Sequence, residues 1–195
     1  MERKTNREQF YQASLRLFFE KGYKATSMRN IADKLDIQAP TLYNYVKSKH
    51  DILENILFDI AGRFHKGMKD IYDSSYSPTE KLKAVVALNV RLTTDYPYHV
   101  YLLVAEWKHL NEDRRDDFLQ NRKEYEGMLR NIISEGIEKG DFRSMNLEIA
   151  MEAILSSIRW LFHWYSRDKE DVLNPIELEK QMLDFILYGV STQNS

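Results

Sequence analysis

Apolar side chains recur every three or four residues along almost all of this 195-residue chain, and only short breaks separate the runs. That spacing places the apolar residues of each run on one side of an α-helix. No stretch of useful length alternates apolar and polar residues as a half-buried strand does. The sequence therefore predicts an all-α fold of about nine helices, expected at residues 5–21, 26–35, 38–45, 49–72, 78–95, 97–110, 112–139, 147–166 and 175–191.

Composition argues against several classes of protein. Because the chain has no cysteine, it can form no disulfide and offers no thiol nucleophile or thiolate metal ligand. No two of its 5 histidines stand three or four residues apart, as a helical zinc site requires, and the sequence has no Gly-rich phosphate loop. We expect neither an enzyme nor a bound metal or cofactor. The longest apolar run, residues 100–105, is far too short to cross a bilayer, so we expect a cytoplasmic protein without a membrane partner.

Charge is divided unevenly along the chain. Residues 1–50 hold 10 Lys and Arg against 5 Asp and Glu, a balance of +5, whereas residues 51–195 hold 18 against 25, a balance of −7. A basic N-terminal part favours a polyanionic partner for that part alone. We therefore expect two domains, a DNA-binding domain at 1–50 and a larger helical domain at 51–195, joined without a flexible linker.

Residues 26–53 predict two short helices joined by a tight turn, in which Asp36 can adopt left-handed backbone geometry. Such a turn leaves the outer face of the second helix free, and that face fits the major groove of DNA. Lysines directly after this helix can neutralise phosphates. The side chains expected to contact DNA are Thr26, Ser27, Arg29, Gln38, Ala39, Pro40, Thr41, Tyr43, Asn44, Tyr45, Lys47 and Lys49.

At these positions the chain resembles the TetR family of transcriptional regulators. The matching features, in chain order, are "LFFEKGY", Thr26-Ser27, Met28, Ile31-Ala32, Asp36-Ile37, Leu42-Tyr43-Asn44-Tyr45-Val46 and "KSKHDIL". The resemblance implies a three-helix DNA-binding head followed by a helical domain for ligand binding and dimerisation. Three residues depart from the family pattern: Asp36 replaces a turn glycine, Gln38 a serine cap and Val46 a phenylalanine. They put the preferred DNA sequence in doubt, but not DNA binding.

The last two predicted helices carry apolar residues on more than one side, so they need two partners. One partner is the core of their own chain, and the other is expected to be the same helices of a second copy. A larger monomer core is the alternative. A dimer would present two heads about 34 Å apart to a palindromic operator. The expected interface residues are Ala150, Ala153, Ser157, Trp164, Met182, Phe185 and Gly189.

Aromatic and methionine residues in the helical domain are candidates for lining a ligand cavity, although plain core packing explains most such residues. The candidates are Phe64, Met68, Tyr72, Leu92, Tyr101, Trp107, Phe118, Tyr125, Met128, Arg159, Trp160 and His163. Residues 153–168, with "EKGDFR" before them, resemble TetR-type regulators of fatty-acid and steroid degradation. This resemblance implies a repressor released from its operator by a small hydrophobic effector such as an acyl-coenzyme A. The alternatives are a regulator responding to a lipophilic drug-like or phenolic compound, or a protein-interaction module with a vestigial DNA-binding head.

Overall fold

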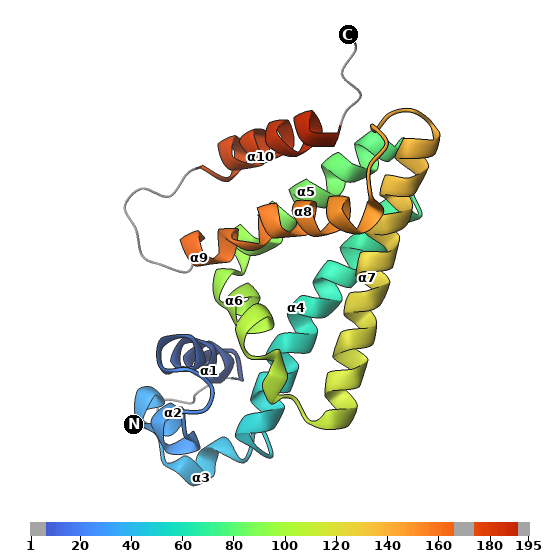
Figure 1. Ribbon diagram of the computed structural model, residues 1–195. Helices are drawn as coiled ribbons and strands as arrows, with labels where there is room; N and C mark the ends of the chain where they lie inside the picture. The colour runs from blue at the N-terminus through green and yellow to red at the C-terminus, as the bar shows by residue number, and fades with distance from the viewer. Residues whose placement is uncertain (1–6, 166–173, 191–195) are drawn as a thin grey trace. The chain divides into compact units, whose positions relative to one another are not determined.

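The computed structural model describes residues 7–165 and 174–190, and all the regular elements in these ranges are helices (Figure 1). This confirms the predicted all-α class. The elements are α1 (Arg7–Lys21), α2 (Met28–Leu35), α3 (Ala39–Leu42), α4 (Lys49–Tyr72), α5 (Pro78–Asp95), α6 (Pro97–Ala105), the 3₁₀ helix η1 (Trp107–His109), α7 (Glu112–Glu138), α8 (Leu147–Arg159), α9 (Leu161–Tyr165) and α10 (Pro175–Val190).

The chain packs as two compact units. The first unit consists of Met1–Ile60 together with Tyr98–Phe118, and the second consists of Ala61–Pro97 together with Leu119–Ser195. The first unit thus contains α6, η1 and the start of α7 in addition to α1, α2, α3 and the first half of α4. The domain limits expected from the sequence, 1–50 and 51–195, remain a prediction. The packing instead groups residues 98–118 with residues 1–60.

Left-handed residues end two of the helices in the chain. Gly22 follows α1 with φ +83°, and Asp36 follows α2 with φ 55°, as the sequence predicted for Asp36. The Asp36 N–H donates to the carbonyls of Ala32 and Asp33, so the last turn of α2 is closed. These two caps turn the chain between the three N-terminal helices.

The third helix is shorter than the predicted span of 38–45. Its α-helical part covers Ala39–Leu42, and beyond it the N–H groups of Asn44 and Tyr45 donate three residues back, to Thr41 and Leu42. Such bonds wind the chain more tightly than an α-helix. Leu42 and Val46 point inward as expected, with 0% and 8% of their surface exposed.

The second unit is built around α5, α8 and α10, which pack against one another. Its core combines residues of these helices with others from α4 and α7, including Met68, Val86, Ile133 and Ile154. Ser77 caps α5 in a reciprocal box with Glu80, so this helix begins at Pro78 as predicted.

The helix predicted at 147–166 is interrupted in the structure. The α-helical part of α8 ends at Arg159, Trp160 forms its C-cap, and α9 continues from Leu161. Residue 166 lies outside the described residues. In helix α6, Val100 and Leu102 are the buried residues. None of the described helices has the length and apolar character that a membrane span requires.

Candidate DNA-binding surface

The first unit holds α2 and α3 in place through buried side chains on their inner faces. Ile31 and Leu42 are completely buried, and so are Phe10 and Phe18 of α1. Helix α2 packs against both α1 and α3. Because these apolar residues fix the inner faces, the polar side chains of α2 and α3 are left on the outer face.

Seven of the twelve predicted DNA contacts are exposed on this outer face. Tyr43 is the most prominent, with 57% of its surface exposed although it is a large aromatic side chain. Gln38 is the N-cap residue of α3 but makes no side-chain capping hydrogen bond, so its amide is available to a base edge. The exposed set consists of Ser27, Arg29, Gln38, Pro40, Tyr43, Asn44 and Lys47.

Three further predicted contacts, Ala39, Thr41 and Tyr45, are half-buried. The ring of Tyr45 stacks on the ring of Phe10, with centroids 5.8 Å apart and planes 17° apart. This stacking ties the end of α3 to α1. Tyr45 therefore has a packing role that the sequence did not indicate.

Two predicted contacts point inward instead. Thr26 is 1% exposed, and its hydroxyl donates to the carbonyls of Leu17 and Gly22. The ammonium of Lys49 donates to the carbonyls of Tyr23 and Thr26, at 2.7 and 2.6 Å. These positions do not support the prediction that the Thr26 and Lys49 side chains face DNA. The Thr26 hydroxyl and the Lys49 ammonium form hydrogen bonds within the first unit instead.

The N-terminus of α2 is stabilised by Ser27 and Asn30. The Asn30 N–H donates to the Ser27 hydroxyl at 3.1 Å, and the Ser27 N–H donates back to the Asn30 side-chain oxygen at 2.9 Å. Free N–H groups at the start of a helix attract an anion such as a phosphate. The sequence pattern did not indicate Asn30, because the usual signal for a capping box is Glu or Gln at this position.

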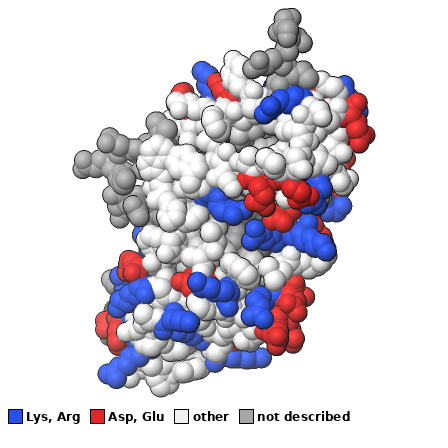
Figure 2. All heavy atoms as spheres, in the orientation of Figure 1, with Lys and Arg blue, Asp and Glu red and all other residues white. Residues whose placement is uncertain are grey.

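Charge on this surface is available to an anionic partner. Arg29 and Lys47 are exposed, and neither is among the described residues that form ion pairs. In Figure 2, basic side chains are spread over the lower left of the face in view, where Figure 1 shows α1, α2 and α3. Unpaired cations in this position can neutralise phosphates on DNA.

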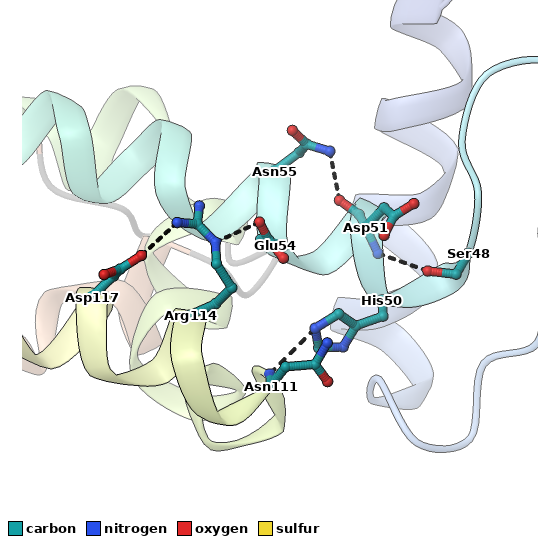
Figure 3. Close-up of polar contacts among 8 residues, drawn as sticks. All are labelled: Ser48, His50, Asp51, Glu54, Asn55, Asn111, Arg114 and Asp117. Atoms are coloured by element: carbon teal, nitrogen blue, oxygen red, sulfur yellow. Dashed lines mark hydrogen bonds and ion pairs between the residues drawn. The ribbon is translucent and has the colours of Figure 1, made fainter.

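The start of α4 is fastened to the start of α7 within the first unit (Figure 3). The Arg114 guanidinium donates to Glu54 at 2.6 Å and to Asp117 at 2.7 Å, and it lies 3.9 Å from the centre of the Phe58 ring. The hydrogen bond to Glu54 raises the pKa of Arg114 further. The bond to Glu54 joins residues 60 positions apart, so no local sequence pattern could have predicted it.

Shorter polar contacts order the beginning of α4 in the same region. The Asn111 N–H donates to the His50 ring at 3.3 Å, and the Asp51 N–H donates to the Ser48 hydroxyl at 3.1 Å (Figure 3). The Lys47 N–H in turn donates to the Asp51 carboxylate at 3.1 Å. Two hydrogen bonds with Asp51 therefore fix the segment that carries Lys47 and Ser48.

The residues predicted to line a ligand cavity fall into separate groups. In the second unit, Phe64 packs edge-on against Tyr125 with centroids 6.4 Å apart, and Met68, Tyr72 and Met128 belong to or contact the core. Leu92, also in the second unit, is buried. In the first unit, Trp107 stacks on Phe118, and Tyr101 packs against Phe19. Arg159, Trp160 and His163 are all exposed, and which of the candidates line a ligand cavity stays a prediction.

Tyr125 brings a polar group into the apolar part of the second unit. Its hydroxyl accepts a hydrogen bond from the Asn89 amide at 2.7 Å, and burial raises the pKa of Tyr125 to about 12.

A separate groove of about 570 Å³ lies between α4, α5 and α10, with Asp70, Leu88 and Glu179 among its lining residues. None of the predicted cavity residues lines this groove.

The predicted dimer residues are likewise divided. Ala153, Phe185 and Gly189 are exposed, while Ser157 and Trp164 are half-buried. Ala150 and Met182 are only 5% and 7% exposed, and both belong to the core of their own chain, so for these two the structure argues against an interface. The sequence pattern did not single out two large exposed apolar side chains on the same two helices, namely Ile149 and Tyr188.

Family models match both parts of the chain. Residues 10–56 match the model described as bacterial regulatory proteins of the tetR family, and residues 75–190 match the tetracyclin repressor-like C-terminal domain. The chain belongs to the TetR family of transcriptional regulators. It is accordingly a ligand-responsive, DNA-binding regulator of transcription, in a family of regulators rather than enzymes. Among the described residues no cluster of three or more potential metal ligands occurs.

Individual relatives share the whole length of the chain. The transcriptional repressor KstR2 of Mycolicibacterium smegmatis is 27% identical over 189 residues, covering 96% of this chain and 91% of its own. The fatty acid metabolism regulator of Bacillus subtilis is 23% identical, covering 93% and 94%. The structure of the ketosteroid regulator KstR2 of Mycobacterium tuberculosis superimposes with a TM-score of 0.90 at 23% identity, covering 98% of each chain. AibR in complex with isovaleryl coenzyme A and operator DNA has a TM-score of 0.78 at 21% identity, covering 92% and 96%.

Proposed function

We propose that this protein is a cytoplasmic repressor that binds a palindromic operator as a homodimer and leaves it when a small hydrophobic effector binds the second unit. The observation that carries the proposal is the outer face of α2 and α3. Gln38, Tyr43 and Asn44 are exposed there, whereas Leu42 between them is completely buried. A face of this kind can read base edges while Arg29 and Lys47 contact phosphates.

Dimerisation is supported by apolar side chains left in water on α8 and α10. Phe185 is 69% exposed and Tyr188 is 82% exposed, and both lie outside the stripe of α10 that buries Met182 and Ile186. On α8, Ile149 is 71% exposed. Large apolar side chains that are exposed in this way mark an interaction surface. A second copy of the same helices would cover them in a symmetric dimer.

Substitution on α10 tests this interface. We expect the variant Phe185→Glu to sediment as a monomer at micromolar concentration while the unsubstituted protein sediments as a dimer, because a carboxylate cannot be buried unpaired in the interface. Lys83→Glu, at an exposed position of α5, is the control and should remain dimeric. A Phe185→Glu protein that stays fully dimeric would place the interface elsewhere.

An acyl-coenzyme A effector is supported by what similar proteins regulate or bind and by the chemistry of the second unit. The relatives include a regulator of fatty acid metabolism, and a protein of the same fold binds isovaleryl coenzyme A. In this chain Phe64, Met68 and Met128 offer apolar contacts, and the paired Tyr125 and Asn89 offer polar ones. A few polar groups in apolar surroundings are typical of small-molecule sites.

The experiment that tests the effector begins with duplex fragments selected from random DNA by the purified protein. Octanoyl-, isovaleryl- and steroid-derived coenzyme A thioesters are then titrated into the complex, with free fatty acids and a phenolic compound as comparisons. We expect a thioester to release the DNA. For this effect the thioester needs only to bind the protein conformation of low DNA affinity more tightly than the conformation that binds DNA. Release by the phenolic compound alone would favour the drug-like class instead.

A further inference from the structure

A polar cluster beside the loop that precedes α2 joins three separate segments of the first unit. Lys49, the first residue of α4, donates from its ammonium to the carbonyls of Tyr23 and Thr26. The same ammonium lies 4.2 Å from the centre of the Tyr23 ring, a distance typical of a cation–π contact. Lys49 thus holds the loop between α1 and α2 at both its ends.

The third segment is the turn around η1, which lies outside the helix-turn-helix. The Tyr23 N–H donates to a carboxylate oxygen of Glu106 at 3.4 Å, and the other oxygen lies 3.2 Å from Nε2 of His109. The His109 ring stacks on the Tyr23 ring, with centroids 5.5 Å apart. Only 13% of the Glu106 side chain and 17% of the His109 side chain are exposed.

Electrostatics favour this arrangement. Burial lowers the pKa of Lys49, and the negative charge of Glu106 opposes that effect. Burial also lowers the pKa of His109, again against the influence of Glu106. The negative charge of Glu106 therefore favours the charged form of the Lys49 ammonium in this partly buried position.

The loop held by this cluster is the one that positions the start of α2. It ends at Thr26 and Ser27, and Ser27 caps α2. The Thr26 hydroxyl is bonded back to the carbonyls of Leu17 and Gly22, whereas the Thr26 carbonyl is held from the side of α4 by the ammonium of Lys49. A shift of this loop would move the helix N-terminus that faces a phosphate.

We propose that Lys49 and Glu106 are positioning residues for DNA binding, which fix the loop at residues 22–27 and touch neither phosphate nor base. The inference rests on DNA binding by α2 and α3 and is independent of dimerisation and of the effector. It also assigns a function to the turn around η1, because Glu106 connects that turn to Tyr23, in the loop before α2, over 83 residues of sequence.

Salt dependence separates positioning from phosphate contact. Removing one phosphate contact changes the slope of log affinity against log salt by about 0.9. We expect Lys49→Met to weaken binding about tenfold at every salt concentration with the slope unchanged, because the Lys49 ammonium donates its hydrogen bonds inside the protein and not to phosphate. Lys47→Met, which removes an exposed cation from each copy, should flatten the slope by about 0.9 for every copy bound. The probe is a duplex fragment selected from random DNA and followed by fluorescence anisotropy.

Glu106→Gln provides the sharper test. This change makes the protein more positive, so long-range electrostatics alone would tighten DNA binding. We expect the opposite, a loss of about tenfold, because the loop loses its anchor and Lys49 its counter-charge. Glu20→Gln, which makes the same charge change at an exposed position of α1, is the matched control and should bind as tightly as the parent or slightly more tightly.

Two further variants test the proposal even if the Lys49→Met protein does not fold. Lys49→Arg keeps the charge but not the geometry needed to donate to two carbonyls at 2.7 and 2.6 Å, so it should also lose affinity while melting normally by circular dichroism. In the double variant of Lys49→Met and Glu106→Gln the losses should be less than additive, because both act on one loop. The proposal is wrong if Lys49→Met flattens the salt slope as much as Lys47→Met does, or if Glu106→Gln binds DNA no more weakly than Glu20→Gln.

Discussion

At the scale of single residues, two glycines on α7 differ in what surrounds them. A Cβ on Gly136 would lie 2.2 Å from a ring carbon of Phe142, whereas a Cβ on Gly127 would meet nothing within 4 Å. We expect Gly136→Ala to lower the free energy of unfolding by about 1–3 kcal/mol, since a buried ring cannot make room without moving its neighbours. Gly127→Ala should raise it by up to about 1 kcal/mol, because alanine favours the helix. Urea denaturation measures both, and equal stability of the two variants would contradict the packing of Phe142.

Tyr125 predicts a dependence of stability on alkaline pH. Its pKa is raised to about 12 in the folded protein, from 10.0 in the exposed state, because burial disfavours the phenolate. The folded state therefore holds the proton more tightly, and the stability from this group is complete below pH 10 and is lost as the pH rises through 12. In Tyr125→Phe the free energy of unfolding should fall less steeply between pH 10 and 12 than in the parent. Tyr76→Phe, at a position that is 54% exposed, is the control and should keep the slope of the parent.

At the scale of elements, local signals predicted those helices whose ends carry recognisable caps. The limits of α4 and α5 agree with the prediction, and Ser77, Pro78 and Glu80 show why for α5. The break at Trp160 could not be predicted in this way, since no glycine or proline marks it. Local sequence encodes a helix start, but the packing of the core decides where a long apolar helix is interrupted.

Apolar stripes on α8 and α10 were assigned to the wrong side at particular positions. Ala150 and Met182 were expected at an interface and lie in the core, while Ile149 and Tyr188 were overlooked and are exposed. A helix that is apolar on two sides gives the same periodicity for both. The sequence therefore predicted that two partners exist, but not which residues face each of them.

The contact between α4 and α7 predicts an effect at a distance from any DNA-facing residue. Arg114→Met removes the bonds to Glu54 and Asp117, so we expect the free energy of unfolding to fall by about 1 kcal/mol, a modest loss because these side chains are partly exposed. Arg115→Met loses only a 3.8 Å ion pair to the exposed Glu112 and should change stability by less than about 0.5 kcal/mol. A double-mutant cycle with Glu54→Gln isolates the pair, and a coupling energy of zero would mean that the ion pair shown in Figure 3 contributes nothing to stability.

At the scale of the whole molecule, the residues expected to contact DNA could be proposed from the sequence because they all lie within residues 26–49, which carry a strong local pattern. The supports behind them were not, because Glu106 and Arg114 come from segments far away in the sequence. Lys49 shows the consequence, since a lysine next to a predicted recognition helix looks like a phosphate contact until its partners Tyr23 and Thr26 are known. Sequence patterns thus locate a binding surface more readily than they separate its contacts from its scaffold.

Two DNA-binding surfaces in one dimer predict a specific salt dependence. If each copy contacts the same number of phosphates, the dimer releases twice as many counterions as one copy, and the slope of log affinity against log salt is doubled. Monomeric Phe185→Glu should therefore bind a single half-site with about half the slope measured for the parent protein on the full palindrome, while Gln38, Tyr43 and Asn44 remain exposed and functional. Anisotropy titrations between 50 and 300 mM salt, roughly the range over which such slopes are resolved, give both values. A monomeric variant that keeps the full slope on a half-site would mean that one copy makes all of the phosphate contacts and that pairing serves another purpose.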